Sequence, residues 1–200
     1  MDEAQTLISL DDIISHRQVD SYGQGYWNRV FEFALKTLMR DGEILGLRWN
    51  DVSLETGAIT IRGTAGRVKG QQYIKNKPKS ETSKRELPND PNGSVVKILR
   101  EQLDYLIDNS HPDIDPAERL MLLSKKEFSD DLIFPNTKGS QMDASQPVKA
   151  LKRAFQKVQS TIDPADYKRT QRWQHLADKM SFHDLRVTGG GLSCIKTAYR

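Results

Sequence analysis

The sequence has little cysteine and no long apolar run, and each absence narrows the class of protein. A single cysteine, Cys194, among 200 residues excludes an internal disulfide framework and a cysteine-cluster metal site, and it fits a reducing, cytoplasmic setting. No apolar stretch approaches the length that spans a bilayer, so we expect no membrane contact. The first twelve residues carry acids instead of a basic region, unlike a secretory signal. Internal repeats and low-complexity segments are also lacking, and a 36% hydrophobic fraction indicates a soluble globular protein.

The charge is unevenly distributed, although the net charge is only +3. Residues 1–60 hold ten acids against five Lys and Arg, whereas residues 62–85 hold eight basic side chains against one acid. A second basic stretch runs from Lys149 to Lys179. Such asymmetry indicates a polyanion bound on one face, although a solvated surface explains a charge run alone equally well.

Hydrophobic periodicity predicts a mostly helical protein with a small sheet. We predict helices where apolar residues recur at helical spacing or a proline occupies a first turn: 27–39, 43–49, 95–107, 115–126 and 147–161. We also expect the polar, basic stretch 163–180 to be helical. We predict strands at 58–62, where β-branched residues alternate, at 71–75 and at 84–87, with loops at 63–70 and 76–83. The expected fold class is α+β, a single compact domain over residues 1–188 with a three-stranded antiparallel sheet. Residues 189–200 are expected to form an atypical, flexible tail.

Three local patterns carry charged groups that suit a phosphate. In the first, Arg40 and Glu43 lie three apart in an apolar run, and an arginine buried there requires an anionic partner. In the second, Lys79 lies in a polar loop with hydroxyls and other cations, where a lysine can reach a phosphate or donate a proton. In the third, His183 and Arg186 share one face of a helix that begins after Ser181. Each pattern in isolation is more often structural: an ion pair, a solvated loop lysine and a capped helix.

The order of these patterns resembles the catalytic domain of tyrosine recombinases, the phage integrase family. Met39 to Val52 is similar to the first arginine box of that family. The run from Pro78 to Pro88 is similar to its lysine hairpin, and Phe182-His183-Asp184-Leu185-Arg186 to its second arginine box. Leu132-Ile133-Phe134-Pro135 is a weaker similarity, and the resemblance covers roughly residues 7–188.

The resemblance implies site-specific recombination or integration of double-stranded DNA without a metal or other cofactor. Arg40 and Arg186 would clamp the non-bridging oxygens of the scissile phosphate, Lys79 would protonate the departing 5′-oxygen, and His183 would assist proton transfer. Glu43 would orient the arginine site. The expected DNA contacts outside the catalytic set are Arg67, Lys69, Lys75, Lys77, Ser83, Lys84, Lys152 and Arg153.

The family's nucleophile is a tyrosine on a helix well downstream of the second arginine box. Tyr199 is the only tyrosine after His183, and it lies too close to Arg186 to match that position. We therefore leave the nucleophile unassigned, with Tyr199 as a minor candidate, and expect the family's last helices and its N-terminal DNA-clamping domain to lie outside this chain. Intact members associate on DNA, whereas this chain is expected to be monomeric in solution.

Two alternatives remain open from the sequence. One is a catalytically inactive DNA-binding remnant of an integrase with the same fold. The other is a basic helical module that binds RNA or a protein partner without any phosphate site.

Overall fold

The structure is a computed structural model of the 200-residue chain, and its described residues form two compact units. It describes residues 22, 25–68, 71–75, 85–90, 92–110, 130–160, 165, 171 and 181–185. The first unit comprises Met1–Leu38 and Ala144–Arg200, and the second comprises Met39–Asp143. The helices predicted over 115–126 and 163–180 lie outside the described residues, apart from Ala165 and Gln171.

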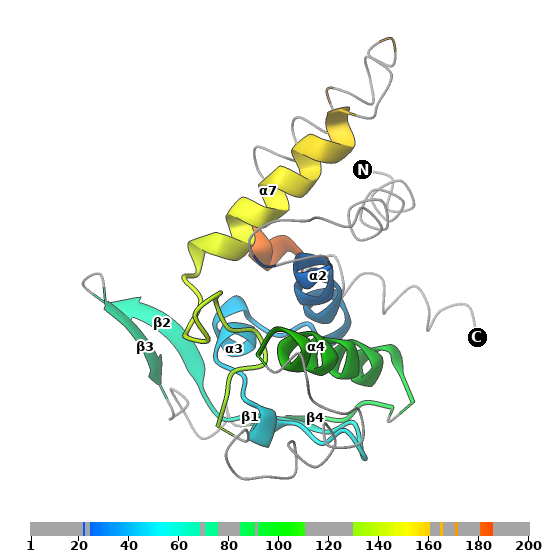
Figure 1. Ribbon diagram of the computed structural model, residues 1–200, viewed down its shortest axis with the longest axis vertical. Coiled ribbons are helices and arrows are strands. Elements are labelled where there is room, and N and C mark those ends of the chain that lie inside the picture. Colours follow the sequence, from blue (N-terminus) through cyan, green and yellow to red (C-terminus); the bar gives the residue numbers. More distant parts are fainter. Residues whose placement is uncertain are drawn as a thin grey trace. The chain divides into compact units, whose positions relative to one another are not determined.

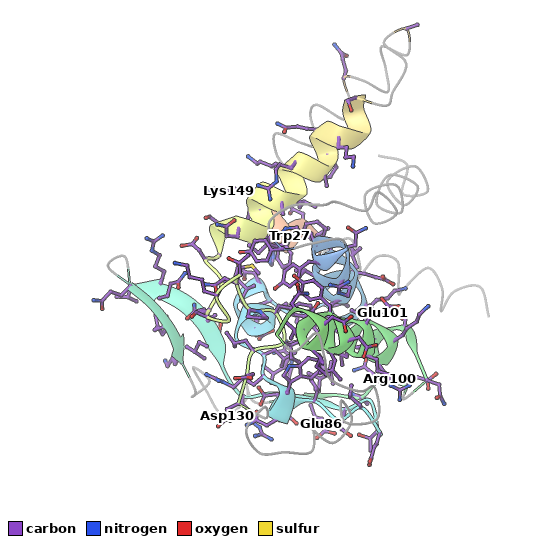
Figure 2. All side chains as sticks on the ribbon, in the orientation of Figure 1. Trp27, Glu86, Arg100, Glu101, Asp130 and Lys149 are labelled. Atoms are coloured by element: carbon purple, nitrogen blue, oxygen red, sulfur yellow. The ribbon has the colours of Figure 1, made fainter. Side chains whose placement is uncertain are left out.

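The first unit is built on two amphipathic helices, α2 (Tyr26–Thr37) and α7 (Ser145–Ser160) (Figure 1). The apolar faces predicted for both helices are buried: Trp27, Val30, Phe31 and Ala34 on α2, and Leu151, Ala154 and Phe155 on α7. The Trp27 ring stacks on Phe31, whose ring in turn contacts Phe182 of the helical turn 182–185. Figure 2 shows the side chain of Lys149 pointing away from α7, as its exposure indicates. The described residues of α7 therefore form a buried apolar side and an exposed basic side, as expected from helical spacing.

The chain leaves α2 earlier than predicted. The helix ends at Thr37, because Leu38 adopts the left-handed conformation with φ 55° and donates its backbone N–H to Ala34. Arg40 is extended, and α3 (Asp41–Leu45) begins immediately after it. The expectation that a helix continues to residue 39 and breaks at Asp41 was therefore wrong, since Asp41 opens the next helix.

Within its described residues, the second unit contains four strands, paired two by two. β1 (Ile59–Ile61) pairs antiparallel with β4 (Arg85–Leu87), and β2 (Thr64–Val68) pairs antiparallel with β3 (Gln71–Lys75). The predicted arrangement of one three-stranded sheet is thus corrected to two two-stranded sheets within the described residues. The reason is that β2 and β3 pair with each other and leave β1 to pair with a strand much further along the chain. Figure 1 shows the β2–β3 pair lying to one side of the β1–β4 pair.

Residues 64–68 form a strand, although their glycine-rich neighbourhood predicted a loop over 63–70. Gly66 lies opposite Tyr73 in the register, and the Tyr73 ring lies across it so closely that a Cβ would come within 2.7 Å of the hydroxyl oxygen. The ring covers the glycine backbone, which offsets the weak strand propensity of glycine. A contact from the opposite strand therefore overrides the local signal.

Helix α4 (Ser94–Ser110) of the second unit extends beyond both ends of the helix predicted over 95–107. The buried side chain of Gln102 donates a hydrogen bond of 2.9 Å to the carbonyl of Ile133. The backbone N–H of Ile133 donates in turn to Leu47 at 3.0 Å, beside the isolated bridge between Arg48 and Leu132. These bonds connect the segment around Ile133 to α4 and to Leu47. The 3-10 helix η1 (Trp49–Asp51) follows that bridge.

No helix among the described residues is both long enough and apolar enough to cross a membrane.

We predict that Gly42→Ala destabilises the second unit. A Cβ at Gly42 would lie 2.5 Å from Thr64 Oγ1 and 2.6 Å from the carbonyl oxygen of Ala65, so α3 and β2 would have to separate. Such overpacking costs about 1–3 kcal/mol, which urea denaturation followed by circular dichroism measures. Lys97→Ala, on the exposed face of α4, should change the free energy of unfolding by less than about 0.5 kcal/mol. Equal stability of both variants would contradict the close approach.

Candidate functional site

The carboxylate of Glu43 lies at the centre of a group of arginines. The backbone N–H of Arg40 donates to Oε2 at 2.8 Å, and Arg40 Nη1 donates to Oε1 at 3.0 Å. Arg85 Nη1 donates to Oε1 at 2.9 Å, and Arg85 Nη2 donates to Oε2 at 2.8 Å. A carboxylate offers about four lone-pair positions, so these four hydrogen bonds use its accepting capacity. We call Arg40, Glu43 and Arg85 the arginine cluster.

The backbone places each member of the arginine cluster. Arg40 precedes α3, and Glu43 is the third residue of that helix, from which its carboxylate caps the Arg40 N–H. Arg85 begins β4 opposite Ile61 of β1, and opposed residues of an antiparallel pair point to the same face. Because Ile61 is buried, Arg85 is directed toward the covered face, where it meets Glu43.

Arg40 differs from the sequence interpretation in its exposure. The expected anionic partner is present as Glu43, but the Arg40 side chain is 55% exposed, whereas that of Glu43 is 7% exposed. The predicted burial of Arg40 was therefore wrong, because Arg40 precedes the helix and does not lie on its buried face. Two guanidinium groups against one carboxylate leave one net positive charge in the arginine cluster, and the more exposed of the two arginine side chains is that of Arg40.

The arginines determine the ionisation of Glu43. Burial raises the pKa of the Glu43 carboxyl, but hydrogen bonds from Arg85, from the Arg40 backbone and from the Arg40 side chain outweigh it. The net pKa lies below the ordinary value of 4.5. Glu43 is therefore an ionised acceptor at neutral pH.

Arg85 is the residue of the cluster that sequence reasoning missed. It was counted within the basic stretch, but nothing linked it to Glu43, which lies 42 positions earlier in the chain. The sequence signal for the direction of Arg85 was the two-residue period of a strand, which places Arg85 on the same face as the apolar Leu87. In the structure these two residues are partly covered, and Glu86 between them is exposed.

Two predicted DNA contacts lie on opposite faces of the β2–β3 hairpin. Lys75 is exposed and pairs with Thr64 on the face that also carries the exposed side chains of Val68 and Tyr73. Arg67 lies on the other face, where its Nη1 forms an ion pair of 3.0 Å with Asp143. Arg67 is thus already engaged by a carboxylate, whereas Lys75 extends from the open face.

Three predicted residues of the first unit are exposed. Ser181 precedes the helical turn 182–185, and its backbone N–H donates to the Asp184 carboxylate at 2.6 Å, which confirms the predicted helix start. His183 is exposed on that turn. Lys152 and Arg153 are exposed on α7, as predicted.

The remaining predicted site residues lie outside the described residues: Lys69, Lys77, Lys79, Ser83, Lys84, Arg186 and Tyr199. Within the described part of the chain, no group of three or more His, Cys, Asp and Glu side chains could hold a metal ion.

A polar cleft of about 320 Å³ in the second unit involves none of the predicted residues. It is lined in part by Arg48, Arg62, Asp51 and Asp130. Arg48 donates its backbone N–H to the Asp51 carboxylate at 3.0 Å and its Nη1 to the carbonyl of Asp130, while Arg62 pairs with Asp51 at 3.4 Å. Burial raises the pKa of Asp51 above its ordinary value of 3.8 despite these partners. The two cations of the cleft are balanced by two carboxylates, so it is a poor site for an anion.

We predict that Glu43→Gln removes an acid-sensitive part of the stability. A folded-state pKa below 4.5 means that ionised Glu43 stabilises the fold above about pH 4.5, and that this stabilisation is lost as the pH falls through the lower folded value. At pH 7 the substitution should lower the free energy of unfolding by about 1–3 kcal/mol, because two arginines lose charged hydrogen-bond partners. Urea denaturation at pH 3 to 7 measures both effects.

Glu86→Gln is the matched control for this substitution, since it makes the same charge change on the exposed face of β4. It should leave the pH dependence of unfolding like that of the parent. Parallel pH profiles for the parent and Glu43→Gln would contradict the assigned role of the carboxylate.

Comparison with known proteins identifies a family. The model of the phage integrase family matches residues 2–190, and no curated protein matches the chain. A solved structure of the Tn1549 transposon integrase in complex with circular intermediate DNA is 19% identical, with a TM-score of 0.65. The same integrase in complex with transposon right end DNA is 18% identical, with a TM-score of 0.64.

These matches cover 91% of this chain but 51% and 50% of the two integrase chains, so this chain spans about half of their length. At such identities the likeness shows the fold, and it confirms the predicted α+β class. Because the family match extends over residues 2–190, the chain belongs to the phage integrase family.

Proposed function

We propose that this chain is the catalytic domain of a tyrosine-type site-specific DNA recombinase. The observation that carries the proposal is the exposed guanidinium of Arg40, held by a buried carboxylate within a chain of the phage integrase family. Double-stranded DNA is the proposed substrate, and integration or excision in the cytoplasm is the proposed reaction. In support, the related Tn1549 integrase was solved in complex with DNA.

In this mechanism Arg40 and Arg186 bind the non-bridging oxygens of one phosphate. Their charge stabilises the transition state, in which negative charge accumulates on those oxygens. A tyrosine oxygen forms a bond to phosphorus as the bond to the 5′-oxygen breaks, and Lys79 donates a proton to that leaving oxygen. His183 hydrogen-bonds the phosphate and assists proton transfer.

Glu43 acts in this mechanism by orienting Arg40. Four hydrogen bonds use its lone-pair positions, and its lowered pKa keeps it ionised, so it is unsuited to transferring a proton itself. We assign Lys75 to contact the DNA backbone from the open face of the hairpin, and Lys152 and Arg153 from α7. We assign Arg67 a weaker DNA contact, because Asp143 competes for its charge.

We predict that Arg40→Ala and Arg186→Ala each weaken binding to duplex DNA. Each removes about one phosphate contact, so the slope of log affinity against log salt should become less steep by about one. Fluorescence anisotropy with a labelled duplex at several salt concentrations measures affinity and slope. Arg100→Ala, which removes an exposed cation of α4 (Figure 2), is the charge-matched control and should retain the parental slope. If both site variants bind like the parent, the chain is not a phosphate-binding recombinase domain but a different basic module.

We predict that Tyr199→Phe leaves covalent trapping on DNA unchanged, because Tyr199 lies too close to Arg186 in sequence for the nucleophile of the family. The assay uses a nicked suicide duplex that carries the recombination site, and it resolves the covalent product by denaturing electrophoresis. Loss of trapping in Tyr199→Phe alone would instead assign Tyr199 as the nucleophile. An inactive remnant would give no covalent product with either the parent or the variant.

A further inference from the structure

Arg85 has a geometric role that neither the integrase family match nor the sequence boxes assign. Among the described residues, both of its hydrogen bonds go to Glu43, one from each terminal nitrogen to each carboxylate oxygen. The side chain is 31% exposed, which makes it more covered than that of Arg40. A two-point arginine–carboxylate contact of this kind constrains orientation as well as charge.

The fork of Arg85 restricts how Arg40 can bind Glu43. Arg85 occupies one lone-pair position on each oxygen, and the Arg40 backbone N–H takes the second position on Oε2. One position on Oε1 is left for the Arg40 side chain, and Nη1 takes it at 3.0 Å. The Arg40 side chain therefore cannot also bind Oε2, and its other guanidinium donors have no partner among the described residues.

Without Arg85, the same carboxylate would offer Arg40 a more favourable arrangement. An arginine beside a carboxylate with open positions on both oxygens forms a bidentate pair, because two parallel charged hydrogen bonds are stronger than one. Arg40 would then direct its donors toward Glu43 and away from solvent. One net positive charge would also be lost from the arginine cluster.

We propose that Arg85 is a positioning residue of the phosphate site, whose two-point contact with Glu43 prevents that carboxylate from sequestering Arg40. Arg40 is consequently held by a single nitrogen and presents its remaining donors to a phosphate. This inference rests on the proposed function for the identity of the anion. The arrangement of the arginine cluster in the free protein can be tested separately.

Arg85 also connects two of the sequence boxes. It begins β4 six positions after Lys79 in the chain, and it contacts Glu43 of the first arginine box. Arginine is required here, because the single ammonium group of a lysine keeps the charge but cannot contact both oxygens as a planar fork. Arg85→Lys therefore separates the contribution of geometry from that of charge.

The first test observes Arg40 in the free protein by NMR of the arginine Nε–Hε groups. In Arg85→Gln the Arg40 signal should shift and exchange more slowly with water, because Arg40 closes onto Glu43. The pKa of the Glu43 carboxyl, followed by carbon-13 NMR, should rise, since the charged groups placed against it are Arg40 and Arg85 alone among the described residues. An Arg40 signal identical to that of the parent in Arg85→Gln would overturn the inference.

The second test is a double-mutant cycle on binding of a labelled DNA duplex. Arg85→Gln should weaken binding about three- to tenfold, the scale of one ordinary hydrogen bond, and Arg85→Lys should also weaken it although the charge is kept. In an Arg40→Ala background, Arg85→Gln should weaken binding no more than Arg100→Gln does in the parent. An equal loss in both backgrounds would show that Arg85 does not act through Arg40.

Two controls keep the outcomes separate. Thermal unfolding by circular dichroism establishes that each variant is folded at the working temperature, and Arg85→Lys carries the cycle if Arg85→Gln is unfolded. If Arg40→Ala alone leaves DNA affinity unchanged, the proposed function fails. The NMR test then still decides whether Arg85 positions Arg40.

Discussion

The second unit depends on the buried carboxylate of Glu43. Through one side chain it caps the start of α3, joins that helix to β4 and holds Arg40 at the surface. A buried charge is costly unless it is paired and hydrogen-bonded, and Glu43 meets both conditions with four donors. The hydrogen bonds that stabilise the buried carboxylate therefore also determine where the two arginine side chains lie. In this way a local feature of the fold becomes the basis of the proposed phosphate site.

A second arginine–acid pair in the same unit shows that spacing alone does not produce the geometry of the arginine cluster. Arg48 and Asp51 repeat the spacing of Arg40 and Glu43, and in both pairs the acid accepts the arginine backbone N–H. Asp51 lacks a forked arginine partner among the described residues, and its pKa is raised, whereas that of Glu43 is lowered. Arg48 is tied to the carbonyl of Asp130. The difference between the two pairs is Arg85, which comes from a distant strand.

The sequence predicted the local parts of this arrangement well. Apolar residues recur at helical spacing along the long helices α2, α4 and α7. This pattern predicts that the segments are helices and that their charged residues face outward. Contacts between strands were the part that it missed. Tyr73 covers Gly66 across the hairpin, and Arg85 reaches Glu43 only because β4 pairs with β1 across the intervening β2–β3 segment. Residue spacing holds no information about such pairing, and the exposure of Arg40 followed from a helix start that hydrophobic periodicity placed wrongly.

The central claim is that the arginine cluster presents Arg40 to a DNA phosphate. It is tested most directly by a crystal structure of the chain bound to a duplex with orthovanadate, a mimic of the pentacoordinate phosphate, at the break. The account predicts Arg40 within hydrogen-bond distance of the vanadate together with Lys79, His183 and Arg186, while Arg85 still grips both oxygens of Glu43. A complex in which Arg40 is turned onto Glu43 and the vanadate lies away from it would contradict the account.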